Sequence, residues 1–148
     1  HVVATDVNPQ ATANTALNAA RHGVADRVRS VTGDLFSGLG RDEVFDLVFW
    51  HSNFVLAPED VGGLNMHDLA YVDPGYHAHR GYLRQVTRRL SPGGVALLGF
   101  SSRGDLARLR SIAAEAGSTV EPVAHREVAE HDSVVDYQLL RVRAEAGR

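Results

Sequence analysis

Two residue types are absent from this 148-residue chain, which contains no cysteine and no lysine. Without cysteine, the chain can form no disulfide and offers no thiolate as a metal ligand or nucleophile. The absence of lysine leaves arginine to carry every permanent positive side-chain charge, and the formal net charge is −3. This charge gives no sign of the basic surface that nucleic-acid binding requires, so nucleic acid is not an expected partner.

Long apolar runs are also missing. No run approaches the roughly 20 residues that a membrane-spanning helix needs, and no targeting segment is recognisable. Hydrophobic residues make up 44% of the chain, which is ordinary for a globular protein with a core. We therefore expect a cytoplasmic protein without a membrane partner.

Short apolar runs alternate with stretches of helical period, which is typical of βα units and a parallel sheet. Asn8 and Pro9 favour a helix start, and Gly23 favours its end. The run 45–50 is apolar almost throughout, which predicts a strand buried on both faces. The expected strands are 1–6, 27–32, 45–50, 95–101, 119–126 and 133–142, and the expected helices are 9–22, 75–90 and 105–116. The apolar face of the first helix is expected to consist of Ala13, Ala16, Leu17 and Ala20.

The predicted fold class is α/β, a Rossmann-like, doubly wound, mostly parallel sheet that closes with a C-terminal antiparallel β-hairpin. We expect one domain over 1–143 and a short tail over 144–148. The segment 51–75 has no clear periodicity, and a connection of this length is typical of a lid. The chain opens directly on a strand, which predicts that a first strand is missing upstream.

Polar side chains gather where the expected strands end, and ligands bind beyond the carboxyl ends of strands in open α/β sheets. Asp6 can accept two hydrogen bonds from a ribose diol, or it can merely cap the following helix, a role that Asn8 already fills. Asp34 can accept a hydrogen bond from an adenine amino group, or it can be a turn residue after Gly33. The pattern favours a nucleoside site.

A spaced series of short motifs carries a family resemblance. The motifs are Asp6-Val7-Asn8-Pro9, Gly33-Asp34-Leu35-Phe36 and Phe45-Asp46-Leu47-Val48. The series resembles the class I S-adenosylmethionine-dependent methyltransferases, and within them the branch of release-factor glutamine and small-domain methyltransferases. The resemblance implies S-adenosylmethionine as cofactor, with Asp6 at the ribose and Asp34 at the adenine. It also implies a glycine-rich loop before the first strand, which this chain lacks. The cofactor-binding residues expected from the resemblance are Asp6, Val7, Asn8, Asp34, Leu35 and Phe36.

The resemblance weakens after Trp50. Members of that branch have Asn-Pro-Pro-Tyr here, a rigid loop that holds a planar amide, whereas this chain has His51-Ser52-Asn53-Phe54. Methyl transfer needs in-line positioning and, for a protonated nucleophile, a base. Histidine is a side-chain type suited to act as that base, which makes His51 the candidate, with a packing or capping role as the alternative. The expected catalytic residues are His51 and Asn53, and the expected substrate contacts are Ser52, Phe54, Tyr71 and His77.

Histidines are frequent in and after the lid, but their spacing does not favour a metal. His77 and His79 are two residues apart, which suits a strand face and not a helix face. We expect solvated histidines and no metal site.

The sequence therefore predicts methyl transfer to a nitrogen or oxygen of a small molecule or peptide. Three alternatives stay open. The chain can be a protein or RNA methyltransferase with a diverged substrate loop, a fragment of an NAD(P)-dependent dehydrogenase, or a non-catalytic binding module. The dehydrogenase alternative predicts a parallel last strand.

Overall fold

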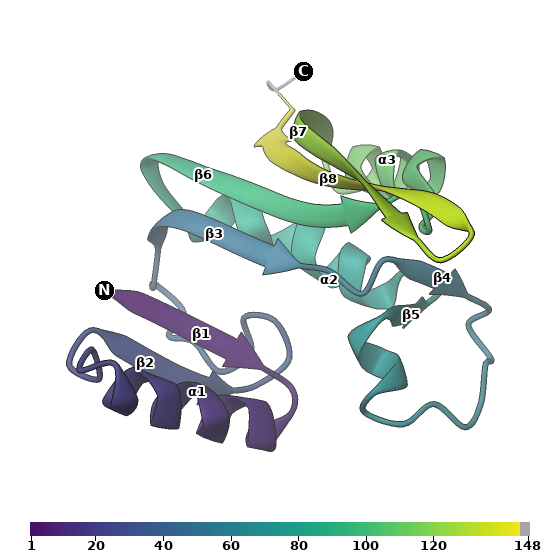
Figure 1. Ribbon diagram of the computed structural model, residues 1–148. Helices are drawn as coiled ribbons and strands as arrows, with labels where there is room; N and C mark the ends of the chain where they lie inside the picture. Colours follow the sequence, from purple (N-terminus) through teal and green to yellow (C-terminus); the bar gives the residue numbers. More distant parts are fainter. Residues whose placement is uncertain (146–148) are drawn as a thin grey trace. The chain divides into compact units, whose positions relative to one another are not determined.

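The computed structural model describes residues 1–145. The chain forms two compact units, His1–Glu43 and Val44–Arg148, which we call unit 1 and unit 2 and describe one at a time (Figure 1). Of the predicted tail 144–148, Ala144 ends the last strand, and residues 146–148 lie outside the described part. No helix within residues 1–145 is both long enough and apolar enough to cross a membrane.

Unit 1 is a single βαβ arrangement. Strands β1 (Val2–Asp6) and β2 (Val28–Thr32) are parallel neighbours, and helix α1 (Pro9–Arg21) connects them. The helix start is as predicted, because the side chain of Asn8 caps it by accepting from the N–H of Gln10 at 2.9 Å. The left-handed Gly23, with φ of +65°, follows the helix end.

Helix α1 contacts the strands mainly through small and hydroxyl-bearing side chains. It buries Thr12 and Ala19, whereas Leu17 is 64% exposed, so the predicted apolar face was wrong. The hydroxyls of Thr12 and Thr32 lie 2.7 Å apart, and the Ser30 hydroxyl donates to the Thr12 carbonyl at 2.8 Å. Hydrogen bonds therefore supply much of the attachment of α1 to β2.

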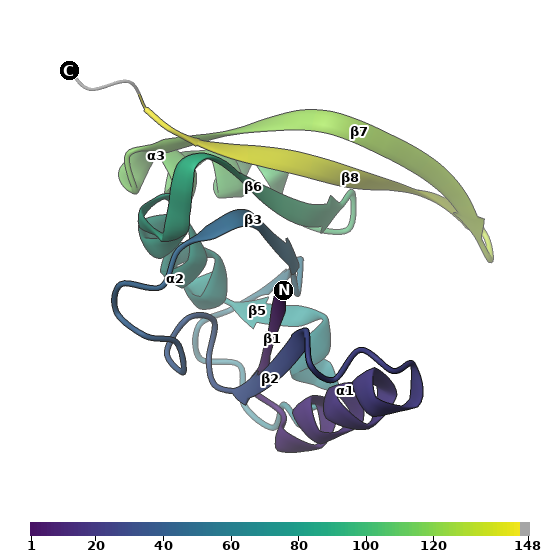
Figure 2. The same cartoon turned by 90° about the vertical axis from the view of Figure 1, so that its left-hand side faces the viewer.

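Unit 2 is built on a four-stranded mixed sheet. Its strands are β3 (Phe45–His51), β6 (Leu90–Ser101), β7 (Ser118–Glu130) and β8 (Ser133–Ala144), in the spatial order β3-β6-β8-β7. Strand β3 runs parallel to β6, whereas β8 is antiparallel to both of its neighbours. Figure 2 shows β7 and β8 as a long curved hairpin. The predicted closing hairpin is therefore confirmed.

Helices α2 (His77–Gln85) and α3 (Leu106–Glu115) lie on one face of this sheet, together with the 3₁₀ turn η2 (Val86–Arg89) (Figure 2). The residues buried there are mostly apolar and come from every one of these elements. They include Leu83, Val86, Ala96, Leu98, Phe100, Leu109, Ile112, Leu140 and Val142.

The opposite face of the sheet has no covering helix within the described part of unit 2. There, Leu47 is 58% exposed and Phe49 is 56% exposed. The prediction that this strand is buried on both faces was therefore wrong. A continuous apolar run is compatible with burial of two faces, but it does not guarantee a cover for each.

The predicted lid contains more structure than its sequence indicates. Strands β4 (Val55–Ala57) and β5 (Val72–Pro74) form a small parallel pair, with the 3₁₀ turn η1 (Asp68–Ala70) between them. The following helix is shorter than the predicted 75–90, because the chain passes into η2 and then into β6 at Leu90. The segment 91–94, which lies between the predicted helix 75–90 and the predicted strand 95–101, belongs to β6, where the pairing with β3 is irregular.

Candidate functional site

In unit 1 the structure brings the two predicted adenosine-binding aspartates to one edge. Asp6 ends β1 and is paired with Thr32, the last residue of β2. The N–H of Gly33 donates to the Asp6 carbonyl at 3.0 Å, and Asp34 follows directly. Because the strands are parallel and adjacent, both carboxyl-bearing residues stand at their carboxyl ends, where α/β sheets bind ligands.

The Asp6 side chain is exposed, and one of its oxygens is engaged locally. Oδ1 accepts from the N–H of Asn8 at 2.8 Å, which orders the turn into α1. Within the described residues Oδ2 accepts no hydrogen bond, so it is available to a ligand. Val7, 48% exposed, lies beside it. The side-chain oxygen of Asn8 is already used as the helix cap.

The turn after β2 is tightly folded. A Cβ on Gly38 would lie 2.5 Å from Cγ1 of Val31, so only glycine fits there. The N–H of Ser37 donates to the Asp34 carbonyl at 2.9 Å. Leu35 has a φ of +49°, a conformation that non-glycine residues keep only where the surroundings determine it. Phe36 is buried, so this side chain anchors the turn while Asp34 stays exposed.

In unit 2 the predicted catalytic loop 51–54 begins at His51, the last residue of β3, and three side-chain hydrogen bonds hold it. The Ser52 hydroxyl donates to the Gly99 carbonyl at 2.8 Å, and Nδ2 of Asn53 donates to the Val72 carbonyl at 3.0 Å. The third bond runs from the Tyr76 hydroxyl to the carbonyl of Phe54, at 2.8 Å.

The side chains of this loop differ in exposure. Ser52 and Phe54 are buried, whereas His51 is the exposed side chain of the four. The loop therefore presents His51 from a backbone that is fixed on its inner side. The predicted substrate contacts Tyr71 and His77 are also exposed, on the segment that leads to α2 and at its first residue.

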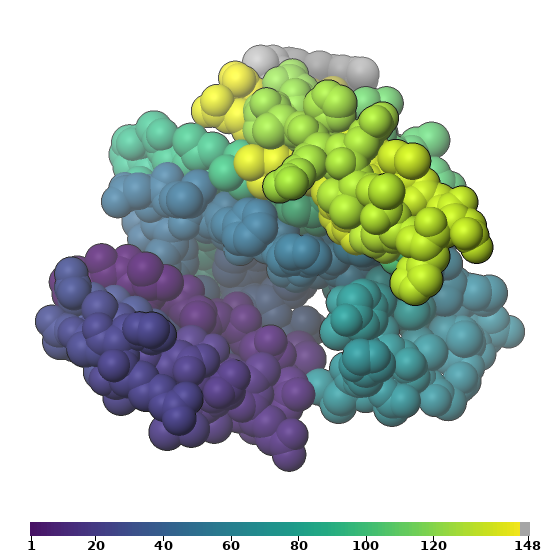
Figure 3. All heavy atoms as spheres, viewed as in Figure 1, coloured from purple at the N-terminus to yellow at the C-terminus, as the bar shows by residue number. Residues whose placement is uncertain are grey.

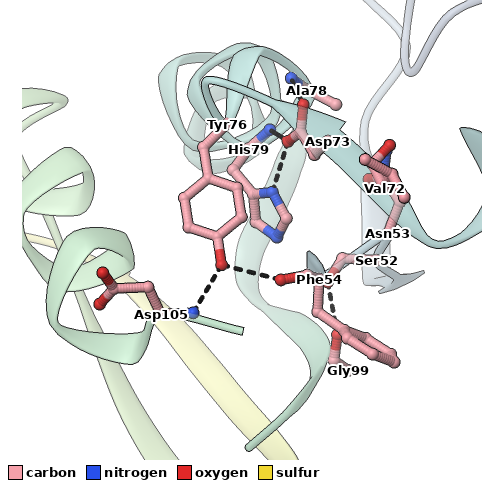
Figure 4. Close-up of polar contacts among 10 residues, drawn as sticks. All are labelled: Ser52, Asn53, Phe54, Val72, Asp73, Tyr76, Ala78, His79, Gly99 and Asp105. Carbon is pink, nitrogen blue, oxygen red and sulfur yellow. Dashed lines mark hydrogen bonds and ion pairs between the residues drawn. The ribbon is translucent and has the colours of Figure 1, made fainter. Parts of the chain in front are cut away.

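Sequence reasoning missed a buried polar cluster behind this loop, formed by Asp73, Tyr76 and His79 (Figure 4). The carboxylate of Asp73 accepts from the N–H groups of Ala78 and His79, both at 3.0 Å, and it lies 2.6 Å from Nδ1 of His79. His79 is fully buried, so the expectation that it is solvated was wrong. Its helical spacing with the buried residues Tyr82, Leu83 and Val86 is the signal that could have placed it inside.

Tyr76 connects this cluster to the loop. Its hydroxyl donates to the Phe54 carbonyl and accepts from the N–H of Asp105 at 2.8 Å, as Figure 4 shows. Burial raises the pKa of Tyr76 to about 12, against the lowering effect of the Asp105 N–H, so the phenol stays protonated at neutral pH. A Cβ on Gly104 would clash with the Phe54 carbonyl oxygen, so this close approach requires glycine.

Acidic and histidine side chains do not assemble into a metal centre in the described part of the chain. Within residues 1–145 no three of them are grouped so that they could hold a metal ion.

Comparison with known proteins places the fold. No protein family profile matches the chain, and no curated protein sequence matches it. Solved structures do match. Ribosomal protein L11 methylase from Lactobacillus delbrueckii subsp. bulgaricus has a TM-score of 0.63 at 16% identity, over 98% of this chain and 58% of its own. The N-methyltransferase NodS from Bradyrhizobium japonicum WM9, in complex with S-adenosyl-L-homocysteine, has a TM-score of 0.60 at 16% identity, over 95% of this chain and 66% of its own.

A third match is a TehB-like SAM-dependent methyltransferase from Corynebacterium glutamicum, with a TM-score of 0.54 at 20% identity, over 94% of this chain and 66% of that protein. This chain therefore spans less than two thirds of the length of each of these structures. At such low identity the likeness establishes the fold, and the predicted Rossmann-like α/β class is confirmed.

Proposed function

We propose that this protein transfers a methyl group from S-adenosylmethionine to a nitrogen or oxygen of a small molecule or peptide. The observation that carries the proposal is the pair Asp6 and Asp34 at the ends of adjacent parallel strands. It occurs in a fold that matches an N-methyltransferase solved with S-adenosyl-L-homocysteine. The antiparallel β8 supports this function over a dehydrogenase, for which the sequence predicts a parallel last strand.

The residues of unit 1 fit the adenosine half of the cofactor. An exposed carboxylate with a free oxygen, as in Asp6, suits a ribose diol, since each hydroxyl can donate to it. Asp34 is exposed and can accept from the adenine amino group, while the accessible apolar side chain of Val7 can contact the ring. Bound here, S-adenosylmethionine would supply an electrophilic methyl group on its sulfonium.

In unit 2 we assign the role of base to His51. Neutral imidazole can take the proton that an acceptor N–H or O–H must lose. The hydrogen bonds of Ser52 and Asn53 fix the loop that follows it, so the imidazole is positioned before the acceptor arrives.

The first experiment measures the affinity for S-adenosyl-L-homocysteine by calorimetry, comparing Asp6→Asn with the parent chain. Asparagine keeps the acceptor for the Asn8 N–H but loses the charge, so we expect binding about tenfold weaker or worse. Asp26→Asn is the matched control, because Asp26 is a 76% exposed carboxylate of the same unit. Equal affinity in all three proteins would contradict the assignment of Asp6.

The second experiment separates binding from chemistry. His51→Ala is expected to keep the affinity for S-adenosyl-L-homocysteine and to lower turnover about 100-fold, the usual contribution of a general base. His22→Ala, a change at an exposed histidine of unit 1, is expected to alter neither quantity. Normal turnover in His51→Ala would exclude His51 as the base.

A further inference from the structure

A groove of about 290 Å³ lies on the face of the unit 2 sheet opposite α2 and α3. We call it the sheet-face groove. Figure 3 looks onto β3 and the β7–β8 hairpin, which appear in blue and yellow-green. The residues that line the groove include Phe49, His51, Gly99, Ala124, Arg126 and Tyr137.

The strand register explains why this face is hollow. His51, Gly99, Leu139 and Ala124 form one cross-strand row over β3, β6, β8 and β7, and cross-strand partners share a face. Gly99 and Ala124 contribute almost no side chain, whereas Phe49 lies two residues before His51 on the same face. Leu139 stands between Gly99 and Ala124 in this row, so the floor at Gly99 lies among the larger side chains of Phe49, His51 and Leu139.

The space above the Gly99 Cα is open, and one methyl group would fill it. A Cβ there would lie 3.5 Å from Cα of His51 and 3.7 Å from the Phe49 ring, which is ordinary van der Waals contact. Glycine is therefore not required by the backbone at this position, and its absence of a side chain keeps space beside an aromatic ring.

One positive charge of the groove is uncommitted. Arg126, paired across the hairpin with Tyr137, forms no ion pair within residues 1–145. Two acids of the hairpin are already engaged, and one of them is Glu130, which binds Arg103 and the Tyr137 hydroxyl. Asp136 likewise lies 3.2 Å from the His125 ring. The groove thus carries a free guanidinium towards β7 and an exposed imidazole, His51, at β3.

We propose that the sheet-face groove binds an aromatic carboxylic acid. The carboxylate would pair with Arg126, for which a planar guanidinium is well suited. The ring would lie over Gly99 against Phe49, and a hydroxyl or amine at the far end of the ring would face His51. The backbones of β3 and β7 are three strand spacings apart, roughly 14 Å. The side chains of His51 and Arg126 extend from these strands and shorten the distance that a ligand has to span.

This ligand is the methyl acceptor, a step that rests on the proposed function. For a phenol, a bond forms between the phenolic oxygen and the methyl carbon while the carbon–sulfur bond of the sulfonium breaks. The electron pair of that bond stays on sulfur, which gives S-adenosyl-L-homocysteine. The phenolic proton goes to His51.

The test measures binding of 3-(4-hydroxyphenyl)propionate by calorimetry with no cofactor present. Its amide, which has the same shape and no charge, serves as the matched ligand. We expect the parent chain to bind the acid about tenfold more tightly than the amide, and Arg126→Gln to abolish this preference. Arg108→Gln, on α3 at the opposite face, should keep the preference for the acid.

Gly99→Ala tests the floor of the groove. It should weaken the binding of both ligands several-fold by filling the floor, without loss of thermal stability.

Three outcomes would overturn the proposal. These are no binding of the acid, equal affinities for acid and amide in the parent chain, and a dimer in sedimentation that dissociates when Phe49→Ser is introduced. The last would mean that a second copy covers this face. Because the assay contains no cofactor, failure of S-adenosyl-L-homocysteine to bind would leave these results standing and would remove only the proposed function.

Discussion

Unit 1 and unit 2 are stabilised in different ways. In unit 2 two helices bury a continuous set of aliphatic and aromatic side chains against the sheet, and several of them, such as Leu98 and Leu109, have no exposed surface. In unit 1 the buried side chains are few, and hydroxyl groups of Thr12, Ser30 and Thr32 connect helix and strand. A thin core of this kind makes the order of unit 1 depend on individual hydrogen bonds, whereas unit 2 depends on apolar burial.

The largest expected effect is a core truncation in unit 2. Leu98→Ala removes a side chain with no exposed surface, so we expect the free energy of unfolding to fall by about 3 kcal/mol. Leu17→Ala is the same chemical change on α1, where the side chain is 64% exposed, and should cost less than about 0.5 kcal/mol. Urea unfolding measures both, and similar losses would mean that the two units do not differ in this way.

A smaller loss is expected when the buried polar cluster is broken. Asp73→Asn keeps the shape but replaces one of the two oxygens that accept from Ala78 and His79. We expect a loss of about 2 kcal/mol, because a buried donor then lacks its acceptor. The exposed Asp132→Asn, in the turn between β7 and β8, is the control and should change stability little. An unchanged unfolding midpoint in Asp73→Asn would show that the apolar core alone stabilises unit 2.

In unit 1 the corresponding change is Thr12→Val, which is nearly isosteric but removes the hydroxyl. It leaves Thr32 without its hydrogen-bond partner on α1, and we expect a loss of about 1 kcal/mol. Thr15→Val removes a hydroxyl that bonds only within the helix, to the Ala11 carbonyl, and should cost less. Hydrogen exchange of the β2 amides distinguishes them, since only Thr12→Val should speed exchange there. Equal exchange in both variants would argue against hydroxyl attachment of α1.

The last expected effect is confined to alkaline pH. Burial raises the pKa of Tyr76 from 10.0 to about 12, so its contribution to stability is complete below pH 10 and is lost as the pH rises towards 12. Burial also raises the pKa of Tyr82. Unfolding curves of Tyr76→Phe should therefore shift less across this range than those of the parent. Tyr71→Phe, at a 51% exposed position, should keep the pH dependence of stability that the parent shows. If Tyr76→Phe also kept it, the assignment of this pH dependence to Tyr76 would be refuted.

Prediction from sequence succeeded where local chemistry decides the backbone. Asn8 and Pro9 favour the start of a helix, and α1 begins there, because the cap and the fixed φ act within a few residues. The hairpin at the C-terminus follows from two strand-like runs with a short polar turn, which the structure has between Glu130 and Ser133. For the same reason Asp6 and Asp34 could be assigned to strand ends before any pairing was known.

Prediction failed where the environment of a side chain depends on distant segments. His79 and His77 are close in sequence, yet one is fully buried beside Asp73 and the other is exposed. Their local sequence is equally polar, and only the docking of α2 against the sheet separates them. Likewise β3 has an apolar run on two faces, but the helices of unit 2 cover one of them.

The sequence by itself determined the α/β class, the βα order and the strand-end positions of the candidate site, since these depend on periodicity and on residues adjacent along the chain. Only the tertiary structure decided which polar groups are buried and which side chains are exposed. It also decided that Gly99, Leu139 and Ala124 of separate strands form a row beside His51, because cross-strand register joins residues that are far apart in the chain.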